Sequence, residues 1–404
     1  MRDTFLSSTM LGFMDYIQHA WYSASHWDHE NSYSQLTSTA RALLEFEPPQ
    51  GLRLNLSSLS SPNLATSYSL GSIGLVDGSL SYLYSSLPLF PPRETSQIEL
   101  NHVIHGYRQI QESLSSRDPE TIIHETKEDR NFRNETLMFG RLYLPHSKLE
   151  ALYLRRLSLT QQLKISAVSD GRLKNGGTIL LLHQYDVGKY SAETLYSTDG
   201  GLVGVRGMYN FGSDPREENK IPPWIEDRFY GRFSAGAEIY YGSLNKSGGM
   251  SFGGRFATLP AHKGIPLTAT LTLNPLMGNV STTHAVKAGR NISLCSRFDF
   301  NFYSYESDLA LACELWKMKR QEVVAQGRSK AAKLEWKLDS VSETDTASKE
   351  VAGILKARID QNWRIGLLWE GRVKELLFTL GSSIDMKRRD QPLRTIGVEL
   401  QYSS

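Results

Sequence analysis

The residue types that most often carry enzyme chemistry do not fall into a catalytic pattern in this sequence. Two glycine-rich stretches, "GSIGLVDG" (71–78) and "GGLVGVRG" (200–207), lack the spacing of a phosphate-binding loop or of a dinucleotide-binding turn. No serine or cysteine lies in a nucleophile-elbow pattern. The glycines are better explained by bends and close contacts between strands. The sequence therefore predicts no catalytic residue and no enzyme.

The histidines and cysteines do not predict a metal site. The ten histidines show no ligand spacing such as H-E-x-x-H, and the nearest pair, His102 and His105, lies in a charged stretch where we expect it to be solvated. The two cysteines, Cys295 and Cys313, are too few for a disulfide framework or a four-ligand zinc site. We expect both to be reduced thiols, and we predict no metal and no cofactor.

Composition argues against several classes of protein. The 404 residues hold 45 Lys and Arg against 43 Asp and Glu, a formal charge of +2 that gives no general attraction to nucleic acid. No stretch reaches the roughly 18 uninterrupted apolar residues of a membrane-spanning helix. This test leaves a membrane β-barrel open, because half of the residues in its strands are polar.

The chain changes character near Pro49. Residues 1–49 form a predicted N-terminal helical segment, with apolar and aromatic residues at helical spacing over 10–30 and a second short helix over 32–46. From 50 to 404 the sequence consists of short segments in which apolar and polar residues alternate, separated by turn signals such as "NKSGG" and "KAGRN". This second part is the predicted barrel.

The alternating segments have the regularity of barrel strands. In "PLTATLTLN", leucines and an alanine fall on one face and threonines on the other. Two long loops, 86–135 and 317–349, lie outside the pattern and carry many charges. A strand that crosses a bilayer at a tilt needs about 9–11 residues, whereas soluble strands peak at about 5–6 residues. We count about nineteen segments, which begin near residues 51, 65, 77, 136, 149, 162, 177, 189, 201, 229, 249, 267, 278, 291, 306, 350, 362, 374 and 393.

The width of such a barrel indicates where its apolar face points. About nineteen strands enclose a lumen too wide for side chains to fill, so an apolar lining would leave a large defect in water. A polar, wet lumen and a lipid-facing exterior avoid that defect. The sequence therefore predicts an all-β fold with a single transmembrane β-barrel of about nineteen strands. An odd number of strands makes the first and last strands pair in parallel, and strand parity places both long loops on the same side as the C-terminus.

The last segment, "TIGVELQYSS", ends on a strand instead of a polar tail. We expect it to close the barrel against the first strand, near "GLRLNLSS", with its apolar face toward lipid and Glu399 toward the lumen. The pattern Thr395-x-Gly397-x-x-Leu400-x-Tyr402 resembles the C-terminal sorting signal of mitochondrial outer-membrane β-barrels. The resemblance implies that these four residues direct membrane insertion.

Long motifs throughout the chain resemble one family. They include "FMDYIQHAWYSASHW", "DGSLSYLYSSLPL", "GGTILLLHQYDVGKYSAETLYSTDGGLVGVRGMYNFG" and "LTLNPLMGNVSTTHAVKAG". These stretches are similar to the mitochondrial distribution and morphology protein 10 family. The resemblance implies a nineteen-strand barrel of the mitochondrial outer membrane, related in architecture to the voltage-dependent anion channel and the translocase pore.

The resemblance also implies a function in two assemblies. One is the endoplasmic reticulum–mitochondria encounter structure, a tether that exchanges phospholipid at contact sites, in which the barrel anchors subunits that carry lipid-binding domains. The other is the sorting and assembly machinery, with its own barrel and receptors, which helps to mature β-barrels and the translocase of the outer membrane. The long loops would then face the intermembrane space.

Family likeness and strand pattern together single out one pair of side chains. The family's "SLSYLYS" strand is implied to dock on the assembly machinery, and Tyr82 and Tyr84 share one face of it. Lipid contact is the alternative role for this pair. For the whole chain, the alternatives are a metabolite pore and a soluble carbohydrate-binding β-protein.

Overall fold

The structure is a computed structural model, and it contains one large closed sheet and several short helices. It describes residues 10–73, 75–108, 135–173, 175–211, 231–259, 264–289, 291–318, 351–387 and 392–404. In the described part of the chain, no helix is both long and apolar enough to cross a membrane.

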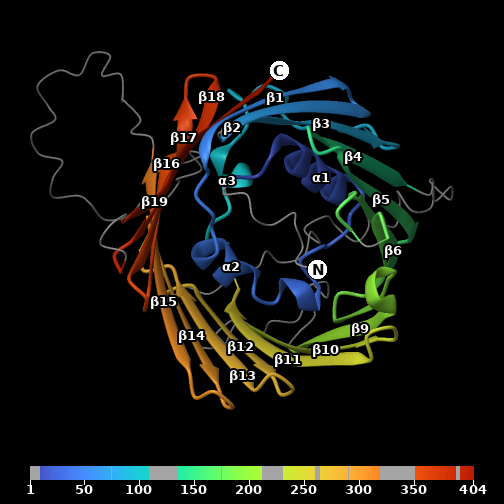
Figure 1. The fold of residues 1–404 in the computed structure, drawn as a ribbon, viewed down its shortest axis with the longest axis vertical. Helices are drawn as coiled ribbons and strands as arrows, with labels where there is room; N and C mark the ends of the chain where they lie inside the picture. The colour runs from blue at the N-terminus through green and yellow to red at the C-terminus, as the bar shows by residue number, and fades with distance from the viewer. Residues whose placement is uncertain are drawn as a thin grey trace, which may run out of the picture.

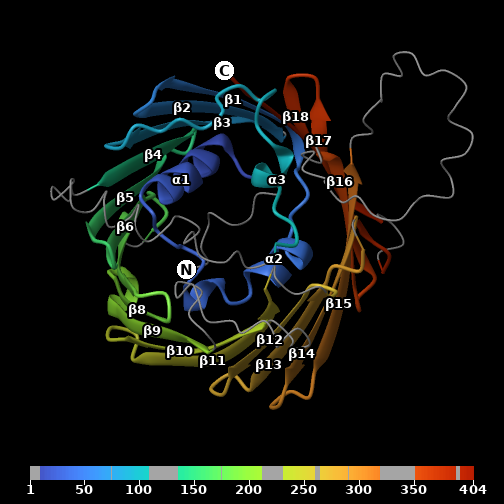
Figure 2. The ribbon, with the colours of Figure 1, turned by 180° about the vertical axis from the view of Figure 1, so that it is seen from behind.

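Nineteen strands form a closed barrel (Figures 1 and 2), which confirms the predicted fold class. Each strand begins within two residues of the position predicted from the alternation. The strands are β1 Gly51–Ser61, β2 Leu64–Ile73, β3 Leu75–Ser85, β4 Thr136–Leu144, β5 Lys148–Ser158, β6 Gln161–Ser169, β7 Gly177–Asp186, β8 Tyr190–Ser197, β9 Leu202–Phe211, β10 Gly231–Gly242, β11 Ser247–Thr258, β12 Leu267–Asn274, β13 Asn279–Val286, β14 Ile292–Asn301, β15 Ser307–Met318, β16 Val351–Asp360, β17 Arg364–Val373, β18 Leu376–Asp385 and β19 Leu393–Ser403.

Each strand pairs in antiparallel fashion with the next, and β1 pairs in parallel with β19. The parallel register runs from Gly51 opposite Gly397 to Ser57 opposite Ser403. Connections that follow odd-numbered strands therefore lie at the end of the barrel where β19 finishes, which we call the C-terminal end. Strands β3, β9 and β15, which precede the three longest connections in the sequence, all end there. We call the other end, where β1 begins, the opposite end.

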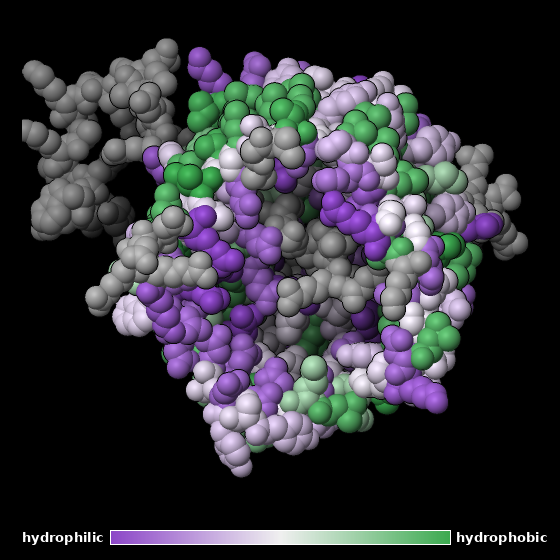
Figure 3. Space-filling view, viewed as in Figure 1, coloured by the Kyte–Doolittle hydropathy of each residue, from purple (hydrophilic) through white to green (hydrophobic). Residues whose placement is uncertain are grey.

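Apolar residues face outward along most strands. On β17, Leu367 and Trp369 are exposed, whereas Leu368 and Glu370, at the alternate positions, are buried inside. Hydrophilic residues lie around the mouth of the barrel, with hydrophobic residues at parts of its outer edge (Figure 3). This is the arrangement that the width argument predicts.

The N-terminal segment lies inside the barrel (Figures 1 and 2). It contains α1 Phe13–Ala24, the 3₁₀ turn η1 Tyr33–Gln35 and α2 Ser38–Leu44. A second 3₁₀ turn, η2 Asp199–Gly201, joins β8 to β9. Helix α1 packs against the inner face of β2 and β3, and α2 packs against the inner face of β13 to β16.

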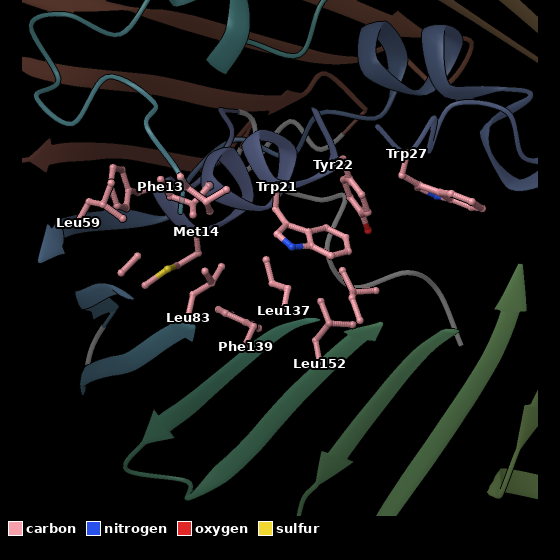
Figure 4. Packing of buried hydrophobic residues seen from close by; sticks show 14 residues of the cluster. Phe13, Met14, Trp21, Tyr22, Trp27, Leu59, Leu83, Leu137, Phe139 and Leu152 are labelled. Atoms are coloured by element: carbon pink, nitrogen blue, oxygen red, sulfur yellow. The ribbon is translucent and has the colours of Figure 1, made fainter. Parts of the chain in front are cut away.

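The inner wall is apolar where α1 covers it, so the predicted polar and wet lumen is wrong for this sector. Trp21 and Met14 lie over Leu83, Leu137 and Phe139 (Figure 4). Trp21 is 0% exposed. Burying a large apolar side chain contributes about 1.5–3 kcal/mol, so this contact holds the segment firmly in the lumen.

Part of the first long connection also enters the lumen. Residues 86–108 include the short helix α3 Leu100–Val103, and Ile104 forms an isolated antiparallel bridge with Met10. The prediction of a solvated histidine pair is wrong for His105, which is half-buried; burial lowers its pKa to about 4. His102 is exposed and lies 3.6 Å from the Glu99 carboxylate. Residues 109–134, and all of the predicted second loop except Lys317 and Met318, lie outside the described residues.

Candidate partner-binding strand and barrel seam

The predicted docking pair lies on the outer face of β3. The side chains of Tyr82 and Tyr84 are 47% and 49% exposed. In register, Tyr82 lies directly between Thr66 on β2 and Gly140 on β4, both of which are small, whereas Tyr84 lies between the larger Leu64 and Met138. The two rings offer apolar faces and hydroxyl groups to whatever covers them.

A third tyrosine extends this surface. Tyr68 on β2 is also exposed, and it lies opposite Leu80, one outward position from Tyr82. Tyr68 is not among the docking residues predicted from the sequence. The signal was available, because "TSYSLG" alternates in the same sense as "SLSYLYS" and its hairpin places the two tyrosines on one face.

The inner face behind this tyrosine surface is tightly packed. Leu83, between the two docking tyrosines, is buried against α1 (Figure 4). Ser81 on the same inner face accepts a hydrogen bond of 3.0 Å from the Arg141 Nε–H. Because α1 supports β3 from inside, the tyrosines project from a wall with little freedom to yield.

The four predicted sorting residues divide between the two faces of β19. Leu400 and Tyr402 point outward, and Thr395 and Gly397 point inward. The structure therefore does not gather them into one surface. Glu399 faces the lumen, where its Oε1 accepts a hydrogen bond of 2.6 Å from the Asn55 side chain across the seam.

Gly397 has a close contact that depends on its lack of a side chain. A Cβ at this position would lie 2.3 Å from the Pro49 carbonyl oxygen and 2.8 Å from the Gln50 nitrogen. Gly381, opposite Gly397 on β18, leaves equivalent space for the rings of Pro48 and Pro49. The chain therefore leaves the lumen and enters β1 through a slot built from these two glycines, which we call the seam slot.

The C-terminal end of the seam is fastened separately. Thr95, in the connection after β3, accepts a hydrogen bond of 2.7 Å from the Ser403 backbone N–H. The Ser403 hydroxyl donates a hydrogen bond of 2.8 Å to the Arg93 carbonyl. The end of the last strand is thus bound to a segment that precedes it by about three hundred residues in sequence.

A buried ion pair holds the same segment against the wall. Lys356 Nζ lies 3.0 Å from Glu370 Oε2, and the two side chains are 1% and 0% exposed. Lys356 also donates a hydrogen bond to the His105 carbonyl. Glu314 on β15 accepts a hydrogen bond of 3.0 Å from the Tyr107 backbone N–H. None of these contacts was predicted from the sequence.

No group of three or more His, Cys, Asp or Glu side chains in the described ranges is arranged to hold a metal ion. Cys295 is buried toward α2 in the lumen and Cys313 lies on an outward position, so the two free thiols are on opposite sides of the wall.

These features define a class of protein: a closed, odd-stranded β-barrel with an apolar outer face and a lumen that holds two segments of its own chain. The chain belongs to the mitochondrial distribution and morphology protein 10 family, whose model matches residues 10–350 and 324–404.

Curated relatives agree with this assignment over nearly the whole chain. The mitochondrial distribution and morphology protein 10 of Sclerotinia sclerotiorum is 67% identical over 400 residues, which are 98% of this chain and 100% of that protein. The protein of the same name in Phaeosphaeria nodorum is 58% identical over 398 residues, again 98% and 100%. The Neurospora crassa protein is 42% identical over 481 aligned positions, with the same two coverages. Neither the family nor these relatives carry the name of an enzyme.

Proposed function

We propose that this chain acts in mitochondrial distribution and morphology as a non-enzymatic barrel of the mitochondrial outer membrane. The observation that carries this proposal is the outward apolar face of a closed nineteen-strand barrel in a chain that is 67% identical to a protein of that name. An apolar exterior of this extent is stable when lipid surrounds it. We place the protein at contact sites between this membrane and the endoplasmic reticulum.

The finer function is an anchor in two assemblies. In the endoplasmic reticulum–mitochondria encounter structure, the barrel would fix subunits with lipid-binding domains to the outer membrane and so support exchange of membrane phospholipid. In the sorting and assembly machinery, it would contact the machinery's barrel and receptors and aid biogenesis of the translocase. A rigid outer wall supported by α1 suits an anchor, since it transmits force without opening.

Two measurements test the membrane placement and the anchoring role. Carbonate extraction of mitochondria should leave the protein in the membrane fraction, and release into the soluble fraction would contradict the barrel placement. Native co-purification in a defined detergent, with masses of the bound proteins, should recover members of both assemblies.

The Tyr82 and Tyr84 pair is the proposed contact with the assembly machinery. Both rings are exposed on a wall that α1 packs against from the inside. Replacing both by Ala should reduce co-purification of the assembly machinery and leave the tether subunits at wild-type level. An equal loss of both sets of partners would mean that the change destabilises the barrel and that the pair has no selective role.

A metabolite pore has less support than an anchor. Residues 10–50 and 86–108 occupy the lumen. Trp21 and Asn31 of the first segment are fully or almost fully buried there, and so is Lys356 on the inner face of β16. Planar-bilayer recording separates the two functions: a large, stable, voltage-gated current from the purified protein would favour the pore.

A further inference from the structure

The outer face of β13 and β14 carries a polar patch in the middle of the apolar wall. His284 on β13 and Ser296 on β14 lie directly opposite each other. Both point outward, because their neighbours Ala285 and Cys295 are buried against α2 on the inside. The imidazole of His284 is exposed. In the described part of the chain, neither side chain has a hydrogen bond to another residue.

The register shows that this patch interrupts an apolar row. The row consists of outward residues that are paired directly across neighbouring strands. On one side of the patch it contains Phe256 of β11 and Ala269 of β12, and on the other side Leu311 of β15 and Ile359 of β16. Ser296 is the fifth of the ten residues of β14. Measured along the membrane normal, and allowing for the tilt of the strand, it therefore lies about 10–13 Å from each end of β14. The patch is therefore near the middle of the face that our proposed function places in lipid.

An imidazole and a hydroxyl at this depth are unfavourable in lipid alone. Acyl chains offer no hydrogen-bond partner, and a polar group without one loses its hydration without compensation. A second outward histidine, His183, lies opposite Thr194 on β8, but its side chain is only half-exposed. His284 is the stronger candidate because its ring is open to a partner.

The size of the surrounding side chains fits a helix better than a lipid. Ala269 and Ser296 are small, and the rows on either side carry the larger exposed Phe298 and Leu294. Small residues let a helix backbone approach closely, and polar side chains between apolar neighbours then form the specific contact.

We propose that a membrane-spanning helix of a partner protein packs on this patch and hydrogen-bonds His284 and Ser296 through a polar side chain in the middle of its apolar span. This inference rests on the proposed membrane placement. Strand β3, with the proposed docking tyrosines, lies on the far side of the barrel from β13 (Figures 1 and 2). The helix and the assembly machinery can therefore bind at the same time.

Site-specific photo-crosslinking in native mitochondrial membranes tests the contact. The full-length protein carries p-benzoylphenylalanine in place of Phe298, the exposed aromatic residue beside Ser296 on the outer face of β14, and a matched variant carries it in place of Leu367, an outward residue of the apolar β17. We expect an adduct from position 298 whose crosslinked peptide lies in the apolar span of another membrane protein and contains a polar residue. Position 367 should give no adduct with that span.

Three crosslinking patterns of the two probe variants would overturn the proposal. They are adducts with lipid alone, adducts with a second copy of this chain, and the same protein adduct from position 367. Adding His284→Leu should reduce the adduct at 298 at least tenfold, and an unchanged yield would also overturn the proposal. Carbonate extraction of the same membranes shows separately whether the protein is embedded, so a failed membrane placement is not confused with a missing helix.

A stability measurement separates a partner contact from a structural role. In lipid vesicles without partners, we expect His284→Leu to leave the urea midpoint unchanged or to raise it, because leucine is better suited to lipid than imidazole. A lowered midpoint would show that His284 stabilises the barrel itself and would contradict the proposal.

Discussion

Replacing Gly397 by Ala tests whether the seam slot holds the barrel closed. The added methyl group would lie 2.3 Å from the Pro49 carbonyl oxygen, and the obstacle is backbone that cannot rotate away. The wall or the Pro48–Gln50 segment must shift instead. Inserting a methyl group into packed structure costs about 1–3 kcal/mol, so we expect the free energy of unfolding to fall by that amount.

The matched control is Gly140→Ala on β4. A Cβ there meets nothing closer than the Glu150 carbonyl oxygen at 4.0 Å. Replacing a strand glycine by alanine without strain raises the free energy of unfolding by about 0.4–1 kcal/mol, because alanine restricts the unfolded chain more than glycine does. The two variants therefore make the same chemical change and should move stability in opposite directions.

The assay is reversible urea unfolding of purified protein in lipid vesicles, followed by tryptophan fluorescence. No assembly machinery is present, so a role of Gly397 as a sorting signal has no effect on the result. If Gly397→Ala is as stable as Gly140→Ala, the slot does not contribute to closure. A stable variant that inserts slowly into mitochondria would instead assign Gly397 to sorting alone.

Three further changes probe other parts of the barrel. Lys356→Met leaves Glu370 buried without its partner and should lower the free energy of unfolding by about 3–5 kcal/mol in the same urea assay. The control is Arg364→Ala, which removes an exposed arginine that lies 3.9 Å from Asp385 and should cost under about 1 kcal/mol. Equal costs would contradict the role of the buried pair. Burial lowers the pKa of His19 to about 3, so its contribution to stability is complete above its usual value of 6.5 and is lost as pH falls toward 3. Asp15 opposes this between about pH 6 and pH 3.8, because burial raises its pKa to about 6 and protonation then favours the folded state. The two effects nearly cancel over that range, so tryptophan fluorescence should show net loosening of α1 only below about pH 4, and His19→Gln should not show it. Tyr402→Ala should slow insertion of imported protein into mitochondrial membranes, and wild-type kinetics would remove this residue from the sorting signal.

The strands could be predicted from sequence because each one carries its own evidence. In "PLTATLTLN" and "NWRIGLLWE" the period of two is complete within one strand, and turn residues bound it. The parallel pairing of β1 with β19 follows from the odd count alone. The outward position of Tyr82 and Tyr84 likewise follows from local alternation.

The lumen could not be predicted in the same way. The contacts of Trp21 with Leu137, and of Lys356 with the His105 carbonyl, join residues more than a hundred positions apart. Alternation in β4 and β5 gives apolar residues on both faces, and nothing in that local pattern shows that α1 covers the inner one. In the sequence, Pro49 is an ordinary turn residue and Gly397 an ordinary strand residue, and nothing near either of them shows that the two are in close contact.

The seam slot and the Thr95 contact with Ser403 have a consequence for lateral gating. In a barrel with a free seam, the first and last strands can part and admit a strand of another protein. Here such opening would break the parallel ladder, displace Pro49 from the two glycines and free the Ser403 hydroxyl and backbone from Arg93 and Thr95 at once. The seam of this barrel is therefore built to resist strand exchange.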